Sequence, residues 1–175
     1  MRIVIDPGHG GVDPGAIGGG VVKESDINLA VCKKLQPLLL ADGLDVLMTR
    51  LTDVAVPLSE RVRMSDDFGS DLFLSVHCNS AMSAAAQGIE TYLYRTGGRF
   101  AKAIHFGMIN EFSDHIDRGI KSAGFYVLVK TKCPAVLVEL EFISNETQLN
   151  FLIKNENQER MAECLSESIK EYVNG

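Results

Sequence analysis

The stretch RIVIDPGHGGVDPGAIGGG, residues 2–20, decides the fold class and contains the first candidate site residue. Residues 2–6 form a short run rich in β-branched side chains, which predicts a buried strand. A glycine-rich turn follows at once and carries His9. Because α/β sheets bind ligands beyond the carboxyl ends of their strands, we expect this turn to present His9 at a functional edge. The glycines do not read as a phosphate loop, since no Gly-Lys-Ser/Thr ending follows.

The rest of the chain alternates short β-branched runs with longer segments of helical period, which predicts an α/β layer architecture. Further strands are expected at 44–49, 71–77, 88–94, 125–129 and 135–142. Helices are expected at 26–40, 58–68, 99–112 and 156–173. Of the 175 residues, 46% are hydrophobic, and no repeat or linker divides them, so we expect a single domain over 1–175.

Charge and cysteine usage exclude several classes of function. The net charge is −6 and the basic residues are scattered, which argues against a nucleic-acid partner. The four cysteines are widely spaced and form no C-x-x-C pair, so free buried thiols are expected. No apolar run is long enough to span a membrane, and the first residues lack the apolar core of a signal peptide.

Two further residues join His9 as candidate metal ligands. Glu24 lies at the start of the first predicted helix, where the helix dipole alone would also favour a carboxylate. His77 ends the third predicted strand and faces the side opposite to Cys78. A single histidine at a strand end is usually structural, but a His-Glu-His set with an open fourth position is common in catalytic zinc sites. Together the three residues predict a zinc site.

Glu139 is the candidate catalytic residue. It lies in the apolar strand predicted at 135–142, where a carboxylate is costly unless it has a partner. A nearby cation such as a metal ion would stabilise its ionised form. Glu139 would then serve as a general base that activates water.

Several motifs occur in an order typical of one enzyme family. They are DPGHGG, Lys23-Glu24, TRLTD with a downstream LSERV, DLFLSVHCN, RGIK and PAVLVELEFISN. The chain thus resembles the amidase-3 type of N-acetylmuramoyl-L-alanine amidase, a group of cell-wall hydrolases that includes autolysins and endolysins. The resemblance implies one Zn²⁺ ion held at His9, Glu24 and His77, with Glu139 catalytic. It also implies a mixed, mostly parallel six-stranded sheet flanked by helices on both faces.

The same resemblance implies a substrate and a place of action. The substrate would be peptidoglycan, cut at the amide bond between N-acetylmuramic acid and L-alanine, at the bacterial cell wall. Since no signal peptide is evident, export in a longer precursor or release by lysis is expected. An acidic domain is repelled by an anionic wall, so wall affinity would come from a separate cell-wall-binding domain or from close substrate contacts.

The chain departs from the family pattern at Cys78 and at Glu141, where a small residue and a glycine are common. Cys78 is expected to fit into the core. The two-residue strand period would place Glu141 on the same face as Glu139, where one carboxylate would raise the pKa of the other. The alternative, which we favour, places Glu141 at the solvated rim.

Other polar residues support weaker predictions. Asn79, Arg118 and Glu141 are candidates for substrate binding, although Asn79 is also an ordinary turn residue. Arg50, Asp53 and Arg61 match positions of the family pattern, and a structural ion pair would explain their presence as well as a functional role. His105 and His115 lie in or just after a predicted surface helix and are not expected to bind metal.

Two alternative functions remain open from the sequence. A peptidase or a deacetylase acting on peptidoglycan would use the same zinc site. A wall-binding module without catalysis would not need the intact set of His9, Glu24, His77 and Glu139.

Overall fold

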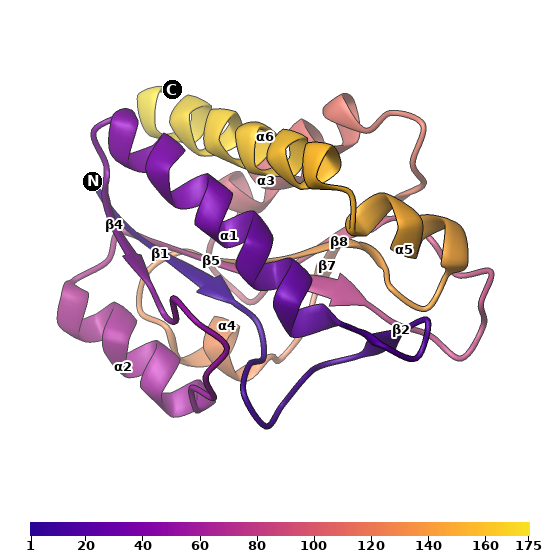
Figure 1. Ribbon diagram of the computed structural model, residues 1–175. Helices are drawn as coiled ribbons and strands as arrows, with labels where there is room; N and C mark the ends of the chain where they lie inside the picture. Colours follow the sequence, from indigo (N-terminus) through magenta and orange to yellow (C-terminus); the bar gives the residue numbers. More distant parts are fainter.

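The computed structural model describes residues 1–175 and has three layers, with helices on both faces of a central sheet (Figure 1). The sheet has six strands in the order β4-β1-β5-β8-β6-β7. Their bounds are β1 Arg2–Pro7, β4 Asp45–Met48, β5 Leu72–Asn79, β6 Ile89–Leu93, β7 Asp117–Ser122 and β8 Ala135–Phe142. The first four of that order are parallel, whereas β6 is antiparallel to β8 and parallel to β7. The predicted mixed, mostly parallel sheet is confirmed.

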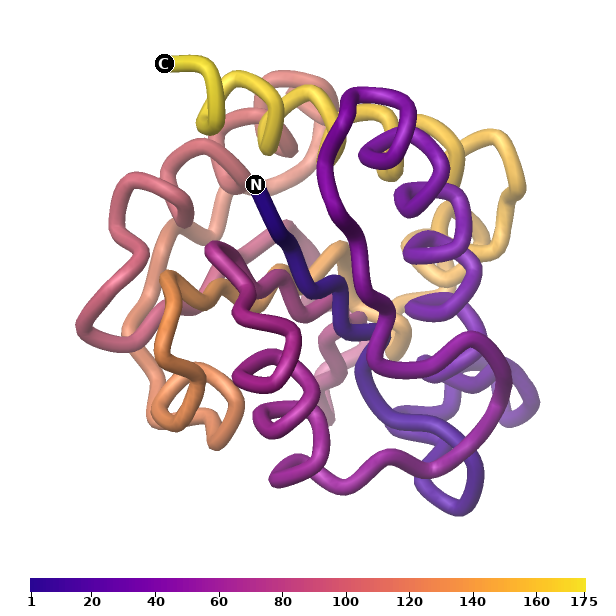
Figure 2. Tube along the Cα trace, turned by 90° about the vertical axis from the view of Figure 1, so that its left-hand side faces the viewer, coloured from indigo at the N-terminus to yellow at the C-terminus, as the bar shows by residue number.

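Two helical layers of unequal thickness cover the sheet. Helices α1 (Glu24–Ala41), α3 (Gly98–Glu111) and α6 (Asn155–Asn174) cover one face, and Figures 1 and 2 show α1 and α6 side by side. Helices α2 (Leu58–Phe68) and α4 (Tyr126–Lys130) lie on the other face. A core cluster of 30 buried residues lies under the first layer, and one of 7 lies under the second. The α2/α4 face is therefore the thinly covered one.

The strand predicted at 125–129 is wrong, because the short helix α4 (Tyr126–Lys130) lies there, with Phe125 as its N-cap residue. Val127 and Leu128 are both buried, while Tyr126 and Val129 are exposed. Adjacent buried residues do not follow the alternation of a strand. A short apolar run does not distinguish a strand from a buried helical turn, and here the helix packs its two adjacent apolar residues onto the sheet.

The true sixth strand, β7, was missed because it is polar and lies at the sheet edge. Its sequence is DRGIKS, and its side chains are exposed or half-buried along the whole strand. Hydrogen bonding to β6 on one side, rather than apolar alternation, makes it a strand. A short helix, α5 (Glu146–Leu152), was also not predicted, although the Asn145 side chain caps it by accepting from the amides of Thr147 and Gln148.

The remaining predicted elements are confirmed within a few residues, and their connections create a switch point. From β1 the chain crosses through α1 to β4 on one side, then through α2 to β5 on the other side of β1. Such reversals open a crevice at the carboxyl ends of the two central strands, where α/β proteins bind ligands. The loop after β1 also contains a two-stranded ribbon of β2 (Ile17–Gly18) and β3 (Val22–Lys23), which leads into α1.

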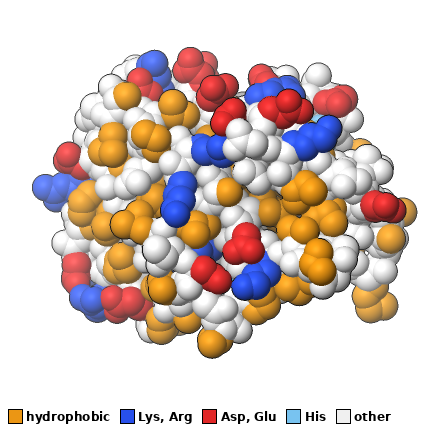
Figure 3. All heavy atoms as spheres, in the orientation of Figure 1, with side chains coloured by type: hydrophobic (Ala, Val, Ile, Leu, Met, Phe, Trp, Pro, Cys, Tyr) orange, Lys and Arg blue, Asp and Glu red, His pale blue; other side chains and the backbone are white.

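The surface and the cysteines agree with the composition. On the face shown in Figure 3, Lys and Arg side chains are interspersed with Asp and Glu rather than gathered into one patch. All four cysteines are free, with Cys32 and Cys78 buried and Cys133 and Cys164 half-buried. None of the helices is both long and apolar enough to cross a membrane.

Candidate metal centre and catalytic residue

His9 lies in the turn directly after β1, in a conformation that needs support. Its φ is 60°, a left-handed value that is unfavourable for a residue with a Cβ atom. The Arg61 guanidinium donates to the His9 carbonyl at 2.8 Å, and Arg50 donates to the Gly8 carbonyl at 2.8 Å. Both arginine side chains are buried, so they fix the turn from below and hold the His9 ring at the switch point.

Glu24 is the first residue of α1 and is only 4% exposed. Its Oε2 accepts from the Ala16 amide at 3.0 Å, and its Oε1 accepts from the Cys78 amide at 3.2 Å. The helix start thus directs the carboxylate into the crevice between β1 and β5. The expected position of Glu24 beside the strand end is the one observed.

His77 reaches the same point from β5. Its Nδ1 lies 2.9 Å from Glu24 Oε1. The ring packs so closely on the loop after β1 that a Cβ atom at Gly8 would lie 2.2 Å from His77 Cε1. Gly8 is therefore required by close approach rather than by turn geometry. Cys78 points the other way into the core, as predicted.

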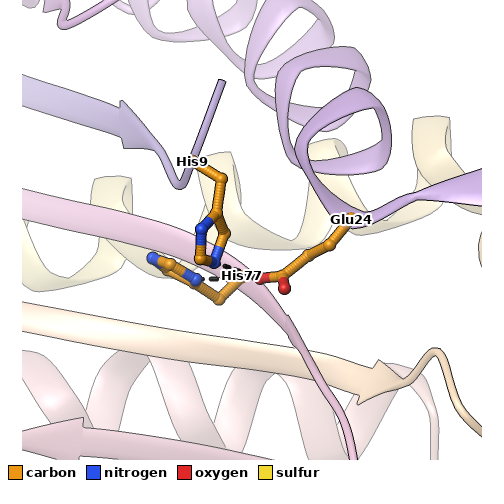
Figure 4. A group of neighbouring side chains, drawn as sticks. All are labelled: His9, Glu24 and His77. Carbon is orange, nitrogen blue, oxygen red and sulfur yellow. Dashed lines mark hydrogen bonds and ion pairs between the residues drawn. The ribbon is translucent and has the colours of Figure 1, made fainter. Parts of the chain in front are cut away.

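The three side chains converge on one point, as Figure 4 shows, and their ligand atoms all lie within 4.8 Å of one another. His9 Nε2 lies 3.2 Å from Glu24 Oε1, and His9 Nδ1 lies 2.8 Å from Asp13 Oδ2. Metal-binding histidines usually donate their second ring nitrogen to such a carboxylate. Two imidazole nitrogens and one carboxylate oxygen are a donor set that suits a zinc ion and leaves a coordination position open for water.

The charges of the triad are strongly coupled. The hydrogen bond to Glu24 raises the pKa of His9 to about 9. Burial alone would raise the pKa of Glu24, but hydrogen bonds from His77 and His9 outweigh it and hold that pKa well below its usual range. Glu24 is thus ionised, and a proton competes with a metal ion for His9.

Glu139 lies beside the triad, on the neighbouring strand. In the parallel register of β5 and β8, Glu139 is the partner of His77. Its Oε2 is buried and has no hydrogen-bond partner within the chain. Burial raises the pKa of its carboxyl to about 7. An unpartnered buried oxygen is costly, and a cation or a polarised water at the triad would provide the missing interaction.

A buried polar network under the loop was not predicted from the sequence. Asp6, which is 1% exposed, accepts from Thr49 Oγ1 at 2.6 Å, from Arg61 at 2.6 Å and from Ser75 Oγ at 2.7 Å. An acidic residue at the end of a buried strand was the available signal. Arg61 therefore has the structural ion pair that was considered for it, whereas Arg50 donates only to backbone carbonyls.

Asp53 binds the loop after β1 from its solvent-exposed side. Its Oδ1 accepts from the Gly11 amide at 2.7 Å, and its Oδ2 lies 3.4 Å from Lys23 Nζ. Its ion-pair partner is thus Lys23.

Asn79 and Arg118 meet at a residue that sequence reasoning missed. Glu90 of β6 is 2% exposed and accepts from Asn79 Nδ2 at 2.5 Å and from Arg118 Nε at 2.7 Å. The Asn79 side chain is thus bonded to Glu90 and, through Oδ1, to the Ser80 amide. The acidic residue within the alternating strand GIETYLY was the available signal for Glu90.

Glu141 is not at the rim and does not share the face of Glu139. The register shifts between β5 and β8, from His77 opposite Glu139 to Asn79 opposite Phe142. One extra residue on β8 is a β-bulge, so Leu140 and Glu141 both lie opposite Cys78. Glu141 is 0% exposed, which leaves it no surface for the substrate contact that was expected.

The Glu141 carboxylate is fully bonded inside the protein. It accepts from the Gly88 amide, from the Phe142 amide and from His115 Nδ1, at 2.8 to 2.9 Å. His105 is likewise internal and contacts Thr91 and Asp117. The side-chain group that could hold a metal consists of His9, Glu24 and His77, and His105 and His115 lie outside it.

A cavity of about 440 Å³ opens beside the triad on the α2/α4 side of the sheet. His9 and His77 form part of its wall, and the apolar segment 55–58 together with Val127 forms another part. The donor set therefore lies next to a space that is large enough for part of a substrate.

Comparisons with known proteins agree with this geometry. The family model described as N-acetylmuramoyl-L-alanine amidase, amidase-3, matches residues 3–171. YqiI of Bacillus subtilis is 36% identical over 97% of this chain and 84% of its own length. The amidase LytC of the same species is 35% identical over 97% of this chain but only 35% of its own length, so this chain spans about a third of that relative.

A solved structure shows the same fold. The amidase AmiC2 of Nostoc punctiforme superposes with a TM-score of 0.97 at 32% identity, covering 100% of this chain and 98% of that one. Because the family model matches nearly the whole sequence and the fold agrees over its whole length, this chain belongs to the amidase-3 family of N-acetylmuramoyl-L-alanine amidases.

Proposed function

We propose that the protein hydrolyses the amide bond between N-acetylmuramic acid and L-alanine in peptidoglycan, with one zinc ion held by His9, Glu24 and His77. The observation that carries the proposal is the position of Glu139. A carboxylate with an unpartnered buried oxygen lies on the strand next to a three-residue donor set that fits zinc. Family membership supports the choice of bond.

The zinc ion would polarise the lactyl amide carbonyl and lower the pKa of a bound water molecule. Glu139 accepts a proton from the attacking water at its carboxylate, for which its raised pKa suits it. It then delivers that proton to the nitrogen of L-alanine as the amide bond breaks. The products are a muramyl carboxylate and a peptide with a free amine.

The residues around the triad prepare it for this reaction. Asp13 orients His9 through Nδ1, so Nε2 would be the atom that holds the metal. The amides of Ala16 and Cys78 orient the Glu24 carboxylate. A fixed donor set costs little reorganisation when the ion binds.

Action on the cell wall follows from the family, and the charge of the chain bears on how it attaches. Since the net charge is −6, electrostatic attraction does not draw this chain to an anionic wall. We propose that attachment relies on close contacts with the substrate or on a separate binding module.

Mass spectrometry of digested sacculi tests the bond. We expect new lactyl carboxylates together with new N-terminal alanine after incubation with the zinc-loaded protein. Amines at other stem residues would indicate a peptidase, and released acetate would indicate a deacetylase. Either result would replace the amidase proposal.

Metal analysis of the same preparation tests the triad. We expect about one zinc ion per chain, and loss of both zinc and hydrolysis in His77→Ala, because a catalytic site has three protein ligands and this variant keeps two. Lys102→Met replaces an exposed residue of α3 and serves as the control, which should keep both zinc and hydrolysis. A wild-type protein without zinc and without hydrolysis would favour a wall-binding module.

A further inference from the structure

Next to Glu139, on the α2/α4 face of the sheet, the buried carboxylate of Glu90 contacts the cationic side chains of Arg118 and Lys121. The pKa of Glu90 is lowered to about 2: burial alone would raise it, but hydrogen bonds from Lys121, Tyr92 and Arg118 prevail. Glu90 Oε2 pairs with Arg118 Nε at 2.7 Å and also with Lys121 Nζ. One negative charge thus faces two positive charges, and the cluster has a net charge of +1 in a chain with net charge −6.

The two cations have capacity to bind an additional anion. Arg118 is 35% exposed and Lys121 is 37% exposed, while Glu90 beneath them is only 3% exposed by its side chain. Arg118 uses Nε for Glu90 and Nη1 for the Gln87 carbonyl, and its Nη2 makes no hydrogen bond within the chain. Lys121 uses one of its three protons for Glu90.

Aromatic rings hold both cationic groups in place. The Arg118 guanidinium lies 4.8 Å from the centre of the Phe142 ring, and Lys121 Nζ lies 5.9 Å from the centre of the Tyr92 ring. Together with the bonds to Glu90, these contacts limit the side chains to one geometry, which reduces the entropy lost on binding a ligand. We call Arg118 and Lys121, with Glu90 beneath them, the cationic shelf.

The cationic shelf and the triad lie on opposite sides of Glu139, because β6 and β7 follow β8 on the side away from β5. Glu90 pairs with Glu139 across β6 and β8, and β7 with its two cations is the next strand outward. Glu139 protonates the L-alanine nitrogen in the proposed reaction, so the stem peptide begins beside Glu139. The cavity along segment 55–58 lies on the other side of the triad, where it is available to the glycan.

The spacing of the sheet defines which part of the peptide reaches the shelf. Strands lie about 4.8 Å apart, so β7 is roughly 10 Å from β8. An extended peptide advances about 3.4 Å per residue, so a group borne by the second or third stem residue spans this distance. The second residue of a stem peptide is an isoglutamate, whose α-carboxylate is either free or amidated.

We propose that the cationic shelf binds the free α-carboxylate of the second stem residue, and that the protein therefore prefers stems that are not amidated there. The inference rests on the proposed amidase function, whose peptide leaving group must lie beyond Glu139. A guanidinium and an ammonium group that share one buried counter-ion form charge-assisted hydrogen bonds with a carboxylate, which an amide does not reproduce.

The experiment compares two muramyl tripeptides that differ only in this group, one with isoglutamate and one with isoglutamine. For the zinc-loaded wild type we expect at least about a tenfold preference in kcat/KM for the isoglutamate compound, carried by KM. Arg118→Gln and Lys121→Gln each keep an N–H donor for Glu90 but remove a charge. Each variant should lose most of the preference, by raising KM for the isoglutamate compound alone.

Matched controls remove the same charges elsewhere. Arg99→Gln and Lys102→Met are exposed changes on α3, on the opposite face of the sheet, and should leave the preference intact. Circular dichroism and zinc content identify variants that lost their fold instead. A wild type that cuts both compounds equally well, or shelf variants that keep the preference, would overturn the inference. Failure to cut either compound at the L-alanine amide would instead count against the amidase function.

Discussion

Glu139 and Glu141 are two residues apart on β8, and they are prepared for different tasks, with Glu139 half-buried and Glu141 fully buried. Glu139 has one buried oxygen without any partner and a pKa that burial raises to about 7. Glu141 accepts from two amides and from His115, and no polar atom of its side chain is left unpaired. The structural carboxylate is thus fully buried and saturated with hydrogen bonds, whereas the proposed reactive one is half-buried and keeps an oxygen without a partner.

The β-bulge makes this difference possible. By inserting one residue between the partners of His77 and Asn79, it turns Glu141 to the α3/α5 side while Glu139 stays on the face of the triad. Two carboxylates on one face would have coupled their protonation, as the strand period suggested. With the bulge, a second acidic residue is accommodated next to the catalytic one without facing it. Bulges commonly redirect side chains near active sites in this way.

Replacing Glu139 should give the largest effect. Glu139→Gln removes the proton acceptor, and we expect hydrolysis of muropeptides to fall by about 10³-fold or more, in the upper range of general-base catalysis. Zinc content and melting temperature should stay close to those of the wild type, because Gln is similar in size and Oε2 loses no partner. Muropeptide hydrolysis and metal analysis on one preparation provide the measurement.

The Glu139→Gln variant should lose activity but still fold, which would separate a catalytic role of Glu139 from a structural one. If Glu139→Gln retained full activity, the base assignment would be wrong. If the variant lost zinc as well as activity, Glu139 would have to be regarded as a metal ligand, and the comparison with Glu141 would no longer be one between a base and a structural residue.

Replacing Glu141 should give the second largest effect, and on stability rather than catalysis. Glu141→Ala leaves the Gly88 amide, the Phe142 amide and His115 without their acceptor, and buried unsatisfied groups cost about 1–3 kcal/mol each. Allowing for relaxation, we expect a loss of about 3 kcal/mol, or roughly 6–12 °C in melting temperature for a chain of this size. Thermal unfolding of the zinc-loaded protein measures it.

The matched variant is Glu141→Gln, which keeps one acceptor oxygen and should lose less stability. Both Glu141 variants should keep zinc and most of the activity at a temperature where they are folded. A Glu141→Ala protein as stable as the wild type, or one that is folded but inactive, would remove the distinction between the two carboxylates.

The sequence predicted the apolar elements of the fold well, and it failed where polar contacts determine structure. The strand at 135–142 matches because it is a long apolar run that is buried on both faces of the sheet. The helix at 156–173 matches because Met161, Leu165 and Ile169 recur every four residues on its buried face. The edge strand β7 has no such periodicity and forms through hydrogen bonds to β6. The run at 125–129 was assigned to the wrong element because it is too short to show a period.

The candidate site shows the same division. His9, Glu24 and His77 were brought together correctly because each lies at the end of a recognisable element. The burial of Glu141 depended on a bulge, which the two-residue period does not reveal. The partners of Glu90 come from β7 and from the end of β5, and local sequence patterns do not predict which distant strands pair.

The smallest effect concerns the pH dependence. Glu139 acts as a base only when ionised, so kcat/KM should fall about tenfold per pH unit below its pKa. Burial raises that pKa from 4.5 to about 7 in the metal-free protein, and a bound cation lowers it, so the acid limb should have its midpoint between these values. Glu141→Gln should leave the midpoint unchanged, since the bulge turns the Glu141 side chain away from the face of the sheet that carries Glu139.

The measurement requires saturating zinc, because protonation of His9 also opposes metal binding as the pH falls. If the midpoint of the acid limb moves with the zinc concentration, protonation of His9 causes the loss of activity. If the midpoint stays fixed, protonation of Glu139 causes it. If Glu141→Gln shifted the fixed limb by a full unit, the two carboxylates would be electrostatically coupled after all. The bulge would then separate their side chains without separating their charges, and the different tasks of the two residues would have to be assigned to hydrogen bonding alone.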